Sequence, residues 1–382
     1  MTMNIEELRN EIDGIDKELV ELFVKRMNVT AQVAEAQRES GKPVYDPGRE
    51  RQLLQKVSDL AGEEMESQTR ILYHLILSLS RAYQSRLLET NHPLTEQVKD
   101  AIAKTEPVFP ERAVVACQGV EGAYSQLACE KLFGAPSIMY LNSFEGVFQA
   151  VDKGLCRYGI LPLENSTAGS VNQIYDLMLR YKFQIVRSTR VHVPHVLLAK
   201  KDAKLADIRE IYSHEQAVQQ CSAFLRDLKN VKVHVCENTA MAAKAVAESG
   251  RCDVAAISSD SCAALYGLDV VETAISNVEN NYTRFICISK NLEIYPGAHR
   301  TSLMLTLPHK PGSLYAVIAK FYSLGINLIK LESRPIPGKD FEFMFYFDID
   351  VSVYSKAFTD LLSQLQAECD TFRYLGSYTE IV

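Results

Sequence analysis

The first 36 residues limit the fold of this chain more than any other segment. Apolar side chains recur there with the alternating three-four spacing of a helix that packs along its whole length. The apolar positions are Ile5, Leu8, Ile12, Ile15, Leu19, Leu22, Val29, Val33 and Ala36. A helix of about 35 residues is about 50 Å long, which is too long for one small domain to cover. We therefore expect this helix to lie against a second copy of itself.

Two further helices are predicted after the first. Asp46 and Pro47 provide the N-cap and the first-turn proline of the second helix, and apolar residues from Ile71 to Leu79 follow one face of the third. The prolines that come after residue 90 cannot continue a helical pattern. The sequence thus predicts an all-α domain at residues 1–90 and a linker at residues 91–110.

The middle of the chain has a different pattern. Between residues 111 and 290, short β-branched runs alternate with amphipathic helices, which indicates parallel sheets with helices on both faces. Strand-rich stretches before and after about residue 190 predict two lobes with a ligand cleft between them. The predicted strands are 113–117, 137–141, 158–161, 183–191, 231–236, 253–257 and 284–289.

The tail at residues 300–382 follows a second linker at residues 291–299. Its pattern reads strand, helix, strand, strand, helix, strand, which is the ferredoxin-like βαββαβ order of an α+β domain. The 382-residue chain is therefore predicted to be a multidomain protein with three parts.

Composition excludes several classes of protein. The net charge is −7, from 41 Lys and Arg against 48 Asp and Glu, and no basic block could follow a phosphate backbone, so we expect no nucleic-acid partner. The sequence shows neither a signal peptide nor an apolar run of about 20 residues, so we expect a cytoplasmic protein without a membrane partner. Nine cysteines without a C-x-x-C pair indicate neither disulfides nor a zinc cluster. We predict no metal site and no cofactor.

Arg26 lies inside the apolar stripe of the first helix, and Gln37 is only about 20° away around that helix. A buried arginine needs a partner anion. One possibility is structural: a polar residue that fixes helix register, with Glu50 or Asp46 as its counter-ion. The helical part has further hydrogen-bond donors but too few nearby acidic residues to neutralise them, which favours a dicarboxylate ligand instead. These donors are Arg9, Arg49, Ser80 and Gln84.

The helical part resembles the all-helical chorismate mutase family. The resemblance rests on Leu8 to Asp13, Arg26, the segment from Lys42 to Arg51, and Ser80 with Gln84. It implies an intertwined dimer in which Arg9 reaches the partner's site. It also implies that Arg9, Arg26 and Arg49 hold the two carboxylates of chorismate, whereas Asp46, Glu50, Ser80 and Gln84 position its ring hydroxyl and ether oxygen.

Gln37 departs from that family, which has a lysine here that donates to the ether oxygen. A neutral amide still donates, but a charge-assisted hydrogen bond is about twice as strong. In the alternative interpretation, the protein has only one enzymatic activity, and its helical domain is a dimerisation module weakened at Gln37.

The middle region resembles the prephenate dehydratase family. The motifs occur in family order: Gly119 to Ser125 as G-x-x-G-x-Y-S, Pro162 to Ser170, Tyr212 to His214, Tyr266 to Leu268, and Thr283 to Phe285. The resemblance implies a two-lobed fold like that of the periplasmic binding proteins. It also implies conversion of prephenate into phenylpyruvate, carbon dioxide and water.

The same resemblance assigns roles to individual residues. Thr283 would donate a hydrogen bond to the departing hydroxyl. The resemblance also implies that the substrate is surrounded by Glu164, Asn165, Ser213 and Gln220. It further implies that Arg284 pairs with a carboxylate. His195 and His214 are interpreted as structural histidines.

The tail resembles the ACT domain of dehydratases, in which L-phenylalanine binds between two copies and inhibits the enzyme. Ser313 replaces the family's alanine. The binding residues implied are Gly312, Ser313, Leu314, Asn327, Leu328, Glu332, Ser333, Arg334 and Pro335. The three parts occur in the order of bifunctional chorismate mutase/prephenate dehydratases of phenylalanine biosynthesis, as a homodimer or higher oligomer. A cleft-bearing sensor without catalysis is the rival from another class.

Overall fold

The structure is a computed structural model that describes residues 4–41, 44–88, 93–336, 338–339, 342–366 and 369–382. Lys42 and Pro43 of the predicted mutase motif lie outside these residues. The chain forms two compact units. One consists of Met1–Gln97, Leu305–Leu328 and Tyr354–Phe372, and the other of Val98–Met304, Ile329–Val353 and Arg373–Val382.

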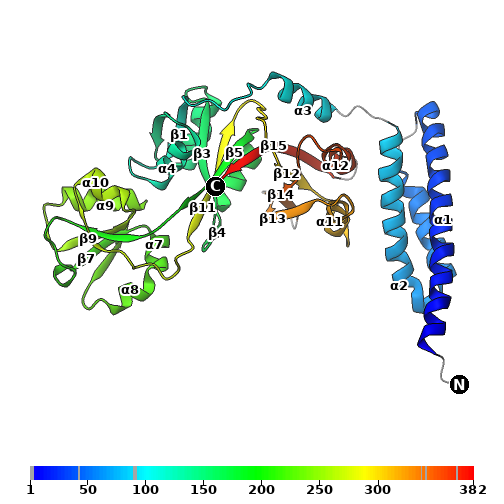
Figure 1. The fold of residues 1–382 in the computed structure, drawn as a ribbon, viewed down its shortest axis with the longest axis horizontal. Helices are drawn as coiled ribbons and strands as arrows, with labels where there is room; N and C mark the ends of the chain where they lie inside the picture. Colours follow the sequence, from blue (N-terminus) through cyan, green and yellow to red (C-terminus); the bar gives the residue numbers. More distant parts are fainter. Residues whose placement is uncertain (1–3, 42–43, 89–92, 337, 340–341, 367–368) are drawn as a thin grey trace. The chain divides into compact units, whose positions relative to one another are not determined.

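The first unit is helical, and its two longest helices lie side by side (Figure 1). Helix α1 spans Ile5–Ser40 and ends at Gly41, which is left-handed with φ 66°. Helix α2 spans Pro47–Leu87, and the side chain of its N-cap Asp46 accepts a hydrogen bond from the Arg49 N–H. Gly62 has φ 71° and ψ 170° and divides α2 into two segments. These segments are the second and third predicted helices. The unit also contains α11 (Ser313–Ser323) and α12 (Lys356–Gln366).

The apolar stripe of α1 is largely exposed in one copy of the chain. Ile12 is 55% exposed, Leu22 62% and Val29 52%. A long exposed apolar stripe is typical of an interaction surface.

The predicted linker at residues 91–110 is partly wrong, because it contains helix α3 (Pro93–Lys104). Pro93 is the first residue of this helix, a position where the missing N–H has no intrahelical acceptor anyway. Val98 and Ala101 of α3 are buried. The proline therefore begins a helix here instead of interrupting one.

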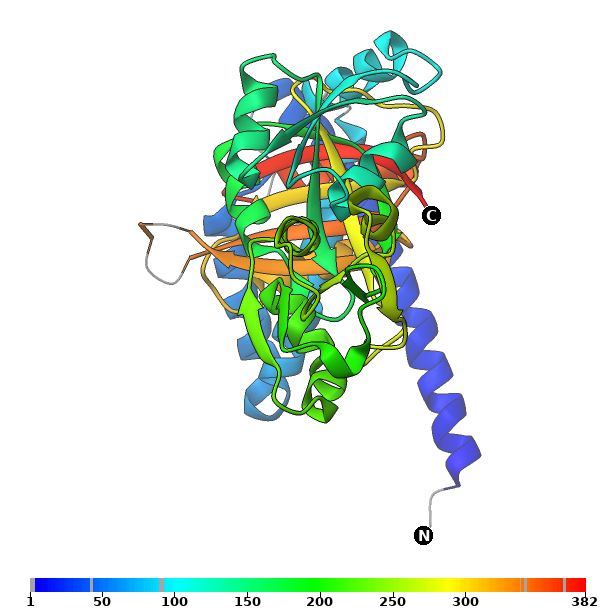
Figure 2. The ribbon, with the colours of Figure 1, turned by 90° about the vertical axis from the view of Figure 1, so that its left-hand side faces the viewer.

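The second unit contains a ten-stranded sheet with the order β13-β14-β12-β15-β5-β11-β3-β1-β2, and β4 pairs with β3. The red and orange strands of the tail lie beside the strands of the first lobe (Figure 2). The first lobe supplies β1 (Val114–Gln118), β2 (Ser137–Leu141), β3 (Tyr158–Asn165), β4 (Gly169–Ser170), β5 (Gln184–His192) and β11 (Tyr282–Ser289). Its helices are α4 (Tyr124–Leu132), α5 (Phe144–Asp152) and α6 (Asn172–Arg180). The tail supplies β12 (Arg300–Thr306), β13 (Asn327–Pro335), β14 (Phe343–Asp350) and β15 (Thr371–Ile381).

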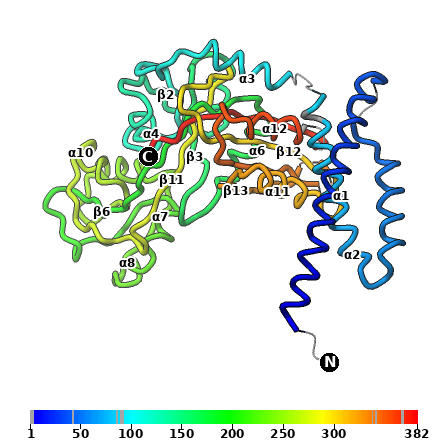
Figure 3. The backbone as a smooth tube through the Cα atoms, turned by 45° about the vertical axis from the view of Figure 1, so that its right-hand side comes forward, coloured from blue at the N-terminus to red at the C-terminus, as the bar shows by residue number. Residues whose placement is uncertain are grey.

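The sheet is mixed, whereas the sequence pattern indicated parallel sheets. β11 runs antiparallel to both of its neighbours, β3 and β5. The reason is that the chain leaves the first lobe after β5, builds the second lobe and returns through β11 (Figure 3).

The second lobe has its own five-stranded sheet, with the order β10-β6-β9-β7-β8. Its strands are β6 (Val196–Ala199), β7 (Glu210–Ser213), β8 (Lys232–Val235), β9 (Val254–Ser258) and β10 (Asp269–Glu272). Its helices are η1 (Leu205–Asp207), α7 (Glu215–Gln220), α8 (Ser222–Asp227), α9 (Thr239–Glu248) and α10 (Ser261–Tyr266). The structure thus has the two predicted lobes, with the chain crossing near residue 192 and again before residue 282.

The tail strands extend the first lobe because β15 pairs in parallel with β5, with Thr379 opposite Arg187. Gly376 allows this close approach. It has φ 132°, and a Cβ atom there would lie 2.3 Å from the Ile185 carbonyl oxygen. Only glycine fits this backbone conformation and this spacing.

Within the described parts of the chain, every helix is too short or too polar to span a bilayer.

Candidate active sites

The predicted dehydratase residues on β3 and β11 lie on opposite faces of the sheet. They form two adjacent pairs across these strands. Thr283 lies opposite Asn165, and Arg284 lies opposite Glu164. Successive side chains of a strand point to opposite faces. Thr283 and Asn165 therefore share one face, and Arg284 and Glu164 share the other.

Asn165 is the centre of a hydrogen-bond network on the first face. Its Oδ1 accepts hydrogen bonds from the backbone N–H groups of Thr167 (3.1 Å) and Ala168 (2.9 Å) and from the Thr167 hydroxyl (2.7 Å). Its Nδ2 donates to Oδ1 of Asn281 (2.7 Å) and to Oγ1 of Thr283 (3.0 Å). Asn165 and Asn281 are buried, so the hydrogen bond between them forms with little competition from water, whereas the bonds to the exposed residues Thr167 and Ala168 are only partly buried.

Gln220, the last residue of α7, joins the network from the second lobe. Its Nε2 donates to Oγ1 of Thr167 at 2.6 Å. Its Oε1 lies 3.0 Å from Nδ2 of Asn281 and 2.7 Å from Nε2 of His195. The structure thus brings together Thr283, Asn165 and Gln220.

Three members of the network were not assigned to the site from the sequence: Thr167, Asn281 and His195. Thr167 comes two residues after Asn165, and Asn281 two residues before Thr283. Asn281 immediately precedes β11, and spacing by two along extended chain keeps side chains on one face, so this signal was available for Asn281. Thr167 lies in the turn between β3 and β4, where strand spacing does not apply. His195 lies between β5 and β6, where the chain crosses from one lobe to the other.

The glycine-containing loop at residues 119–125 also connects the lobes. The Tyr124 hydroxyl donates to the Pro194 carbonyl at 2.6 Å, and the Tyr124 ring packs edge-on against His195. Burial raises the pKa of Tyr124 well above its ordinary value, so the phenol keeps its proton. Gly122 packs tightly against the second lobe, since a Cβ atom there would come within 2.9 Å of Leu265.

Ser213 and His214 do not contact the network. The buried Ser213 hydroxyl donates to the Ile257 carbonyl at 2.8 Å, within the second lobe's sheet. His214 is the N-cap of α7, where its Nδ1 accepts from the Gln216 N–H, and burial lowers its pKa. The structural interpretation of His214 agrees with this position, whereas Ser213 is not placed to touch the network.

On the opposite face, Arg284 is only 4% exposed and contacts protein carboxylates. It donates to Asp348 and pairs with Glu164 (3.2 Å) and Glu380 (3.1 Å). Burial alone would lower its pKa, but Tyr378 and Asp348 raise it far above the ordinary arginine value. The expectation that Arg284 binds a substrate carboxylate is not supported, because its partners belong to the protein.

Glu164 likewise points away from Thr283. Its second carboxylate oxygen, Oε2, accepts from Nζ of Lys330 on β13 at 2.5 Å. Lys330 also donates to the Ser170 hydroxyl at 2.9 Å. Glu164 and Arg284 therefore join the first lobe to the tail strands.

The first unit brings together part of the predicted chorismate set. Nη1 of Arg26 donates to the hydroxyl of Ser80, and both Ser80 and Gln84 are buried. Gln37 is half-buried, Asp46 caps α2, and Glu50 pairs with Arg81. Arg49 and Arg9 are exposed. Arg9 precedes Arg26 by 17 positions, which is about 25 Å along α1, so it cannot reach Arg26 of its own chain.

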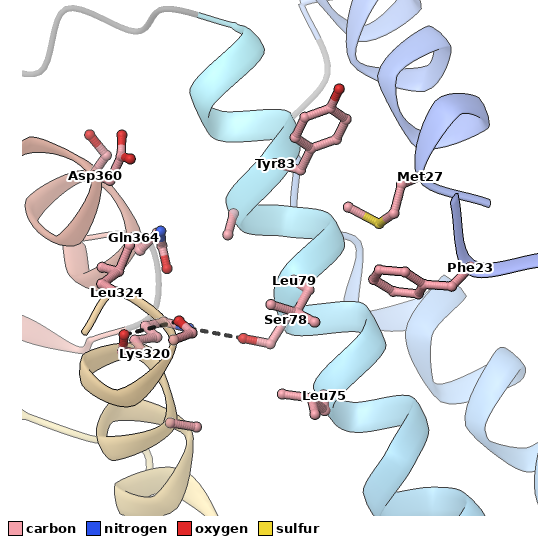
Figure 4. Close-up of a pocket in the computed structure, with 14 residues that line it drawn as sticks. Phe23, Met27, Leu75, Ser78, Leu79, Tyr83, Lys320, Leu324, Asp360 and Gln364 are labelled. Carbon is pink, nitrogen blue, oxygen red and sulfur yellow. Dashed lines mark hydrogen bonds between the residues drawn. The ribbon is translucent and has the colours of Figure 1, made fainter. Parts of the chain in front are cut away.

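A pocket of about 350 Å³ lies elsewhere in this unit (Figure 4). Its lining is mainly apolar and includes Phe23, Leu75 and Leu324. Lys320 donates to the Ser78 hydroxyl at 3.0 Å. None of the residues predicted to bind chorismate lines this pocket.

The predicted phenylalanine-binding residues occupy two places in the tail. Gly312 (φ 85°) is the N-cap of α11, the Ser313 hydroxyl donates to the Pro308 carbonyl, and Leu314 follows in the helix. The others are on β13: Asn327, Leu328, Glu332, Ser333, Arg334 and Pro335. Glu332 accepts a hydrogen bond from Ser170, and Arg334 makes two hydrogen bonds to Asp176.

Among the described residues, no group of three or more His, Cys, Asp or Glu is placed to hold a metal ion.

Comparison with known proteins shows that two parts of the chain match known families. Residues 115–293 match the family described as prephenate dehydratase, and residues 8–85 match chorismate mutase type II. The bifunctional chorismate mutase/prephenate dehydratase of Escherichia coli K12 is 30% identical over 381 residues, covering 97% of this chain and 95% of that protein. The chain belongs to the bifunctional chorismate mutase/prephenate dehydratase family. The predicted family and its two reactions of phenylalanine biosynthesis are confirmed.

Two further relatives extend this comparison. Arogenate dehydratase/prephenate dehydratase 2 of Arabidopsis thaliana is 35% identical over 311 residues, covering 78% of this chain and 81% of that protein. The crystal structure of prephenate dehydratase in complex with L-Phe from Arthrobacter aurescens superposes with a TM-score of 0.64 at 28% identity, covering 70% of this chain and 89% of that one.

Proposed function

We propose that prephenate loses its hydroxyl group at Thr283. The observation that carries this proposal is the hydrogen bond from Nδ2 of Asn165 to Oγ1 of Thr283. An amide nitrogen accepts no hydrogen bond, so the hydroxyl proton of Thr283 must point elsewhere. It is therefore available to an oxygen atom of the substrate.

The chemistry needs one well-placed donor. Prephenate is a cyclohexadiene with a carboxylate and a hydroxyl on opposite ring carbons. The electrons of the breaking carbon–carboxylate bond enter the ring, carbon dioxide leaves, and the carbon–oxygen bond breaks as the ring becomes aromatic. The departing oxygen takes up a proton and leaves as water. A hydrogen bond from Thr283 to that oxygen is strongest when its negative charge develops, which lowers the barrier.

The mutase site requires two copies of the chain. Arg26, Ser80 and Gln84 form one side of a site, while Arg9 lies about 25 Å away along the same helix. The exposed apolar stripe of α1 provides the surface on which a second copy would pack. In such a dimer the partner's α1 supplies Arg9. The rearrangement then needs only a folded conformer and positive charge near the breaking bond, with Gln37 as a neutral donor.

Mixing two inactive variants tests this shared site. Arg9→Ala and Arg26→Ala should each abolish chorismate turnover. Co-refolded in equal amounts, they should recover about a quarter of the wild-type sites, because half of the dimers are mixed and each mixed dimer has one intact site. A mixture that stays inactive, although crosslinking shows mixed dimers, would contradict the proposal.

The tail is proposed to be an ACT domain that binds L-phenylalanine and inhibits the dehydratase. Side chains on one face of β13 support this coupling: Lys330 contacts Glu164, Glu332 contacts Ser170, and Arg334 contacts Asp176. A ligand that moved β13 would disturb these contacts with the first lobe. Glu164 is adjacent to Asn165, so the disturbance is one residue away from the network at Thr283.

Calorimetric titration of the full-length chain with L-phenylalanine tests the regulatory proposal. We expect saturable binding, a fall in prephenate turnover over the same concentration range, and weaker binding to Glu332→Gln. Glu342→Gln is the matched control, because Glu342 is partly buried and pairs with Lys339, three residues before it in the sequence. An intact chain that binds no phenylalanine would overturn this proposal.

A further inference from the structure

The network at Thr283 continues to a buried histidine that the reaction described above does not use. We infer that His195 is a positioning residue of the dehydratase. Its neutral Nε2–H tautomer fixes the Gln220 amide, so that every hydrogen bond in the series that leads from His195 to Thr283 is donated toward Thr283. This inference rests on the proposed role of Thr283.

Backbone groups determine the orientation of two amides in the network. Oδ1 of Asn165 faces the N–H groups of Thr167 and Ala168, so its Nδ2 must face Thr283. Nδ2 of Asn281 donates to the Val193 carbonyl at 3.0 Å. Because backbone donors and acceptors cannot exchange roles, neither amide can be turned around without losing a buried hydrogen bond.

The orientation of Gln220 follows from that of Asn281. Nδ2 of Asn281 also faces Oε1 of Gln220, so this atom must be the amide oxygen. An amide oxygen only accepts, and Nε2 of His195 lies 2.7 Å from it. Nε2 of His195 therefore carries a proton and donates it to Gln220.

The other ring nitrogen of His195 determines its charge. Nδ1 is buried and has no hydrogen-bond partner among the described residues. An unprotonated Nδ1 leaves only a lone pair unsatisfied, whereas a protonated one would bury an unpaired N–H on a charged ring. Gln220 and Tyr124, which contact the ring, are both neutral. Burial accordingly lowers the pKa of His195.

The remaining hydrogen bonds all run in one direction, from Gln220 to Thr283. Nε2 of Gln220 donates to the Thr167 hydroxyl, which donates to Oδ1 of Asn165. Nδ2 of Asn165 then donates to Oγ1 of Thr283, whose proton faces away from the chain. Without His195, the Gln220 oxygen keeps one of its two donors, and its amide can rotate away from Thr167. His195 thus acts on Thr283 through Gln220 and Thr167.

Kinetics of His195 variants test this positioning role. We expect His195→Leu to lower the kcat for prephenate about 10- to 100-fold with little change in KM, and His195→Gln, which keeps a neutral donor, to restore most of it. His234→Leu is the matched control, because His234 lies on β8 in the second lobe and pairs with Glu210 outside the network. Equal losses in His195→Leu and His195→Gln would overturn the inference.

A double-mutant cycle separates this inference from the proposed function. In a Thr283→Val background, His195→Leu should cause almost no further loss of kcat, because the hydrogen bonds that begin at His195 no longer lead to a threonine hydroxyl. Full additivity would overturn the positioning role while leaving Thr283 in place. Near wild-type turnover of Thr283→Val alone would instead overturn the proposed function.

A spectroscopic readout is independent of activity. Nitrogen chemical shifts of ¹⁵N-histidine-labelled protein should show His195 as the neutral Nε2–H tautomer at neutral pH, and should show the ring gaining a proton at a lower pH than an ordinary histidine does. An imidazolium at neutral pH, or the Nδ1–H tautomer, would contradict the assignment.

Discussion

Thr283→Val should lower the kcat of prephenate dehydration by about 100- to 1000-fold, because it removes the donor that faces the departing oxygen. Valine has nearly the same shape as threonine, so packing against Asn165 and Val191 is retained. The expected change in KM is small, since the lost hydrogen bond strengthens mainly in the transition state. The measurement is the initial rate of phenylpyruvate formation at saturating prephenate.

Two controls distinguish loss of the hydroxyl from loss of folding. Thr283→Ser keeps the hydroxyl and should retain most of the turnover. Chorismate turnover by the Thr283→Val protein should remain at the wild-type level, because the mutase residues are in the other unit. A Thr283→Val enzyme within about threefold of wild type would show that the proton donor is another group.

Arg284→Met should lower the local stability of the dehydratase by about 3–5 kcal/mol, because it leaves the buried Asp348 carboxylate without its counter-ion. Glu380 also loses one of its cations, although Arg190 and Arg300 still pair with it. Asp348 is fully buried, and the Glu380 side chain is only 3% exposed. The Tyr378 hydroxyl would also lose the donor that lies 2.8 Å away on Arg284. Hydrogen exchange of peptides from β11 and β14 measures this change where it occurs.

Arg190→Met is the matched control for Arg284. Arg190 pairs with the same Glu380 at 2.8 Å, but its side chain is 46% exposed. Its loss should cost less than about 1 kcal/mol, since water screens an exposed ion pair. Similar protection of β11 in wild type and Arg284→Met would contradict the view that this arginine holds the tail strands to the first lobe.

Much of the fold could be predicted from the sequence because the relevant signals are local. The six elements of the tail follow from hydrophobic periodicity within short windows, and β2 coincides with the predicted strand 137–141. Helix α1 follows from its apolar stripe in the same way. The antiparallel placement of β11 between β3 and β5 could not be predicted, because strand order depends on contacts between distant segments.

The arrangement of the candidate site was predicted only in part, for a reason that Glu164 and Arg284 illustrate. Each is the immediate neighbour of a network residue, Asn165 and Thr283, and neighbours on a strand point to opposite faces. A motif of consecutive residues does not show which members share a face until the strand is recognised. His195 was not assigned because its role depends on Gln220, which is 25 positions away.

Turnover of the purified chain with chorismate alone and, separately, with prephenate alone tests the central claim most directly. Both prephenate and phenylpyruvate are followed over time. The two-enzyme account predicts that phenylpyruvate forms from prephenate, and also from chorismate after prephenate appears as an intermediate. Consumption of prephenate without any turnover of chorismate would contradict the mutase half and leave the helical domain as a dimerisation module with Gln37 in a disabled site. Failure to consume prephenate would contradict the account as a whole.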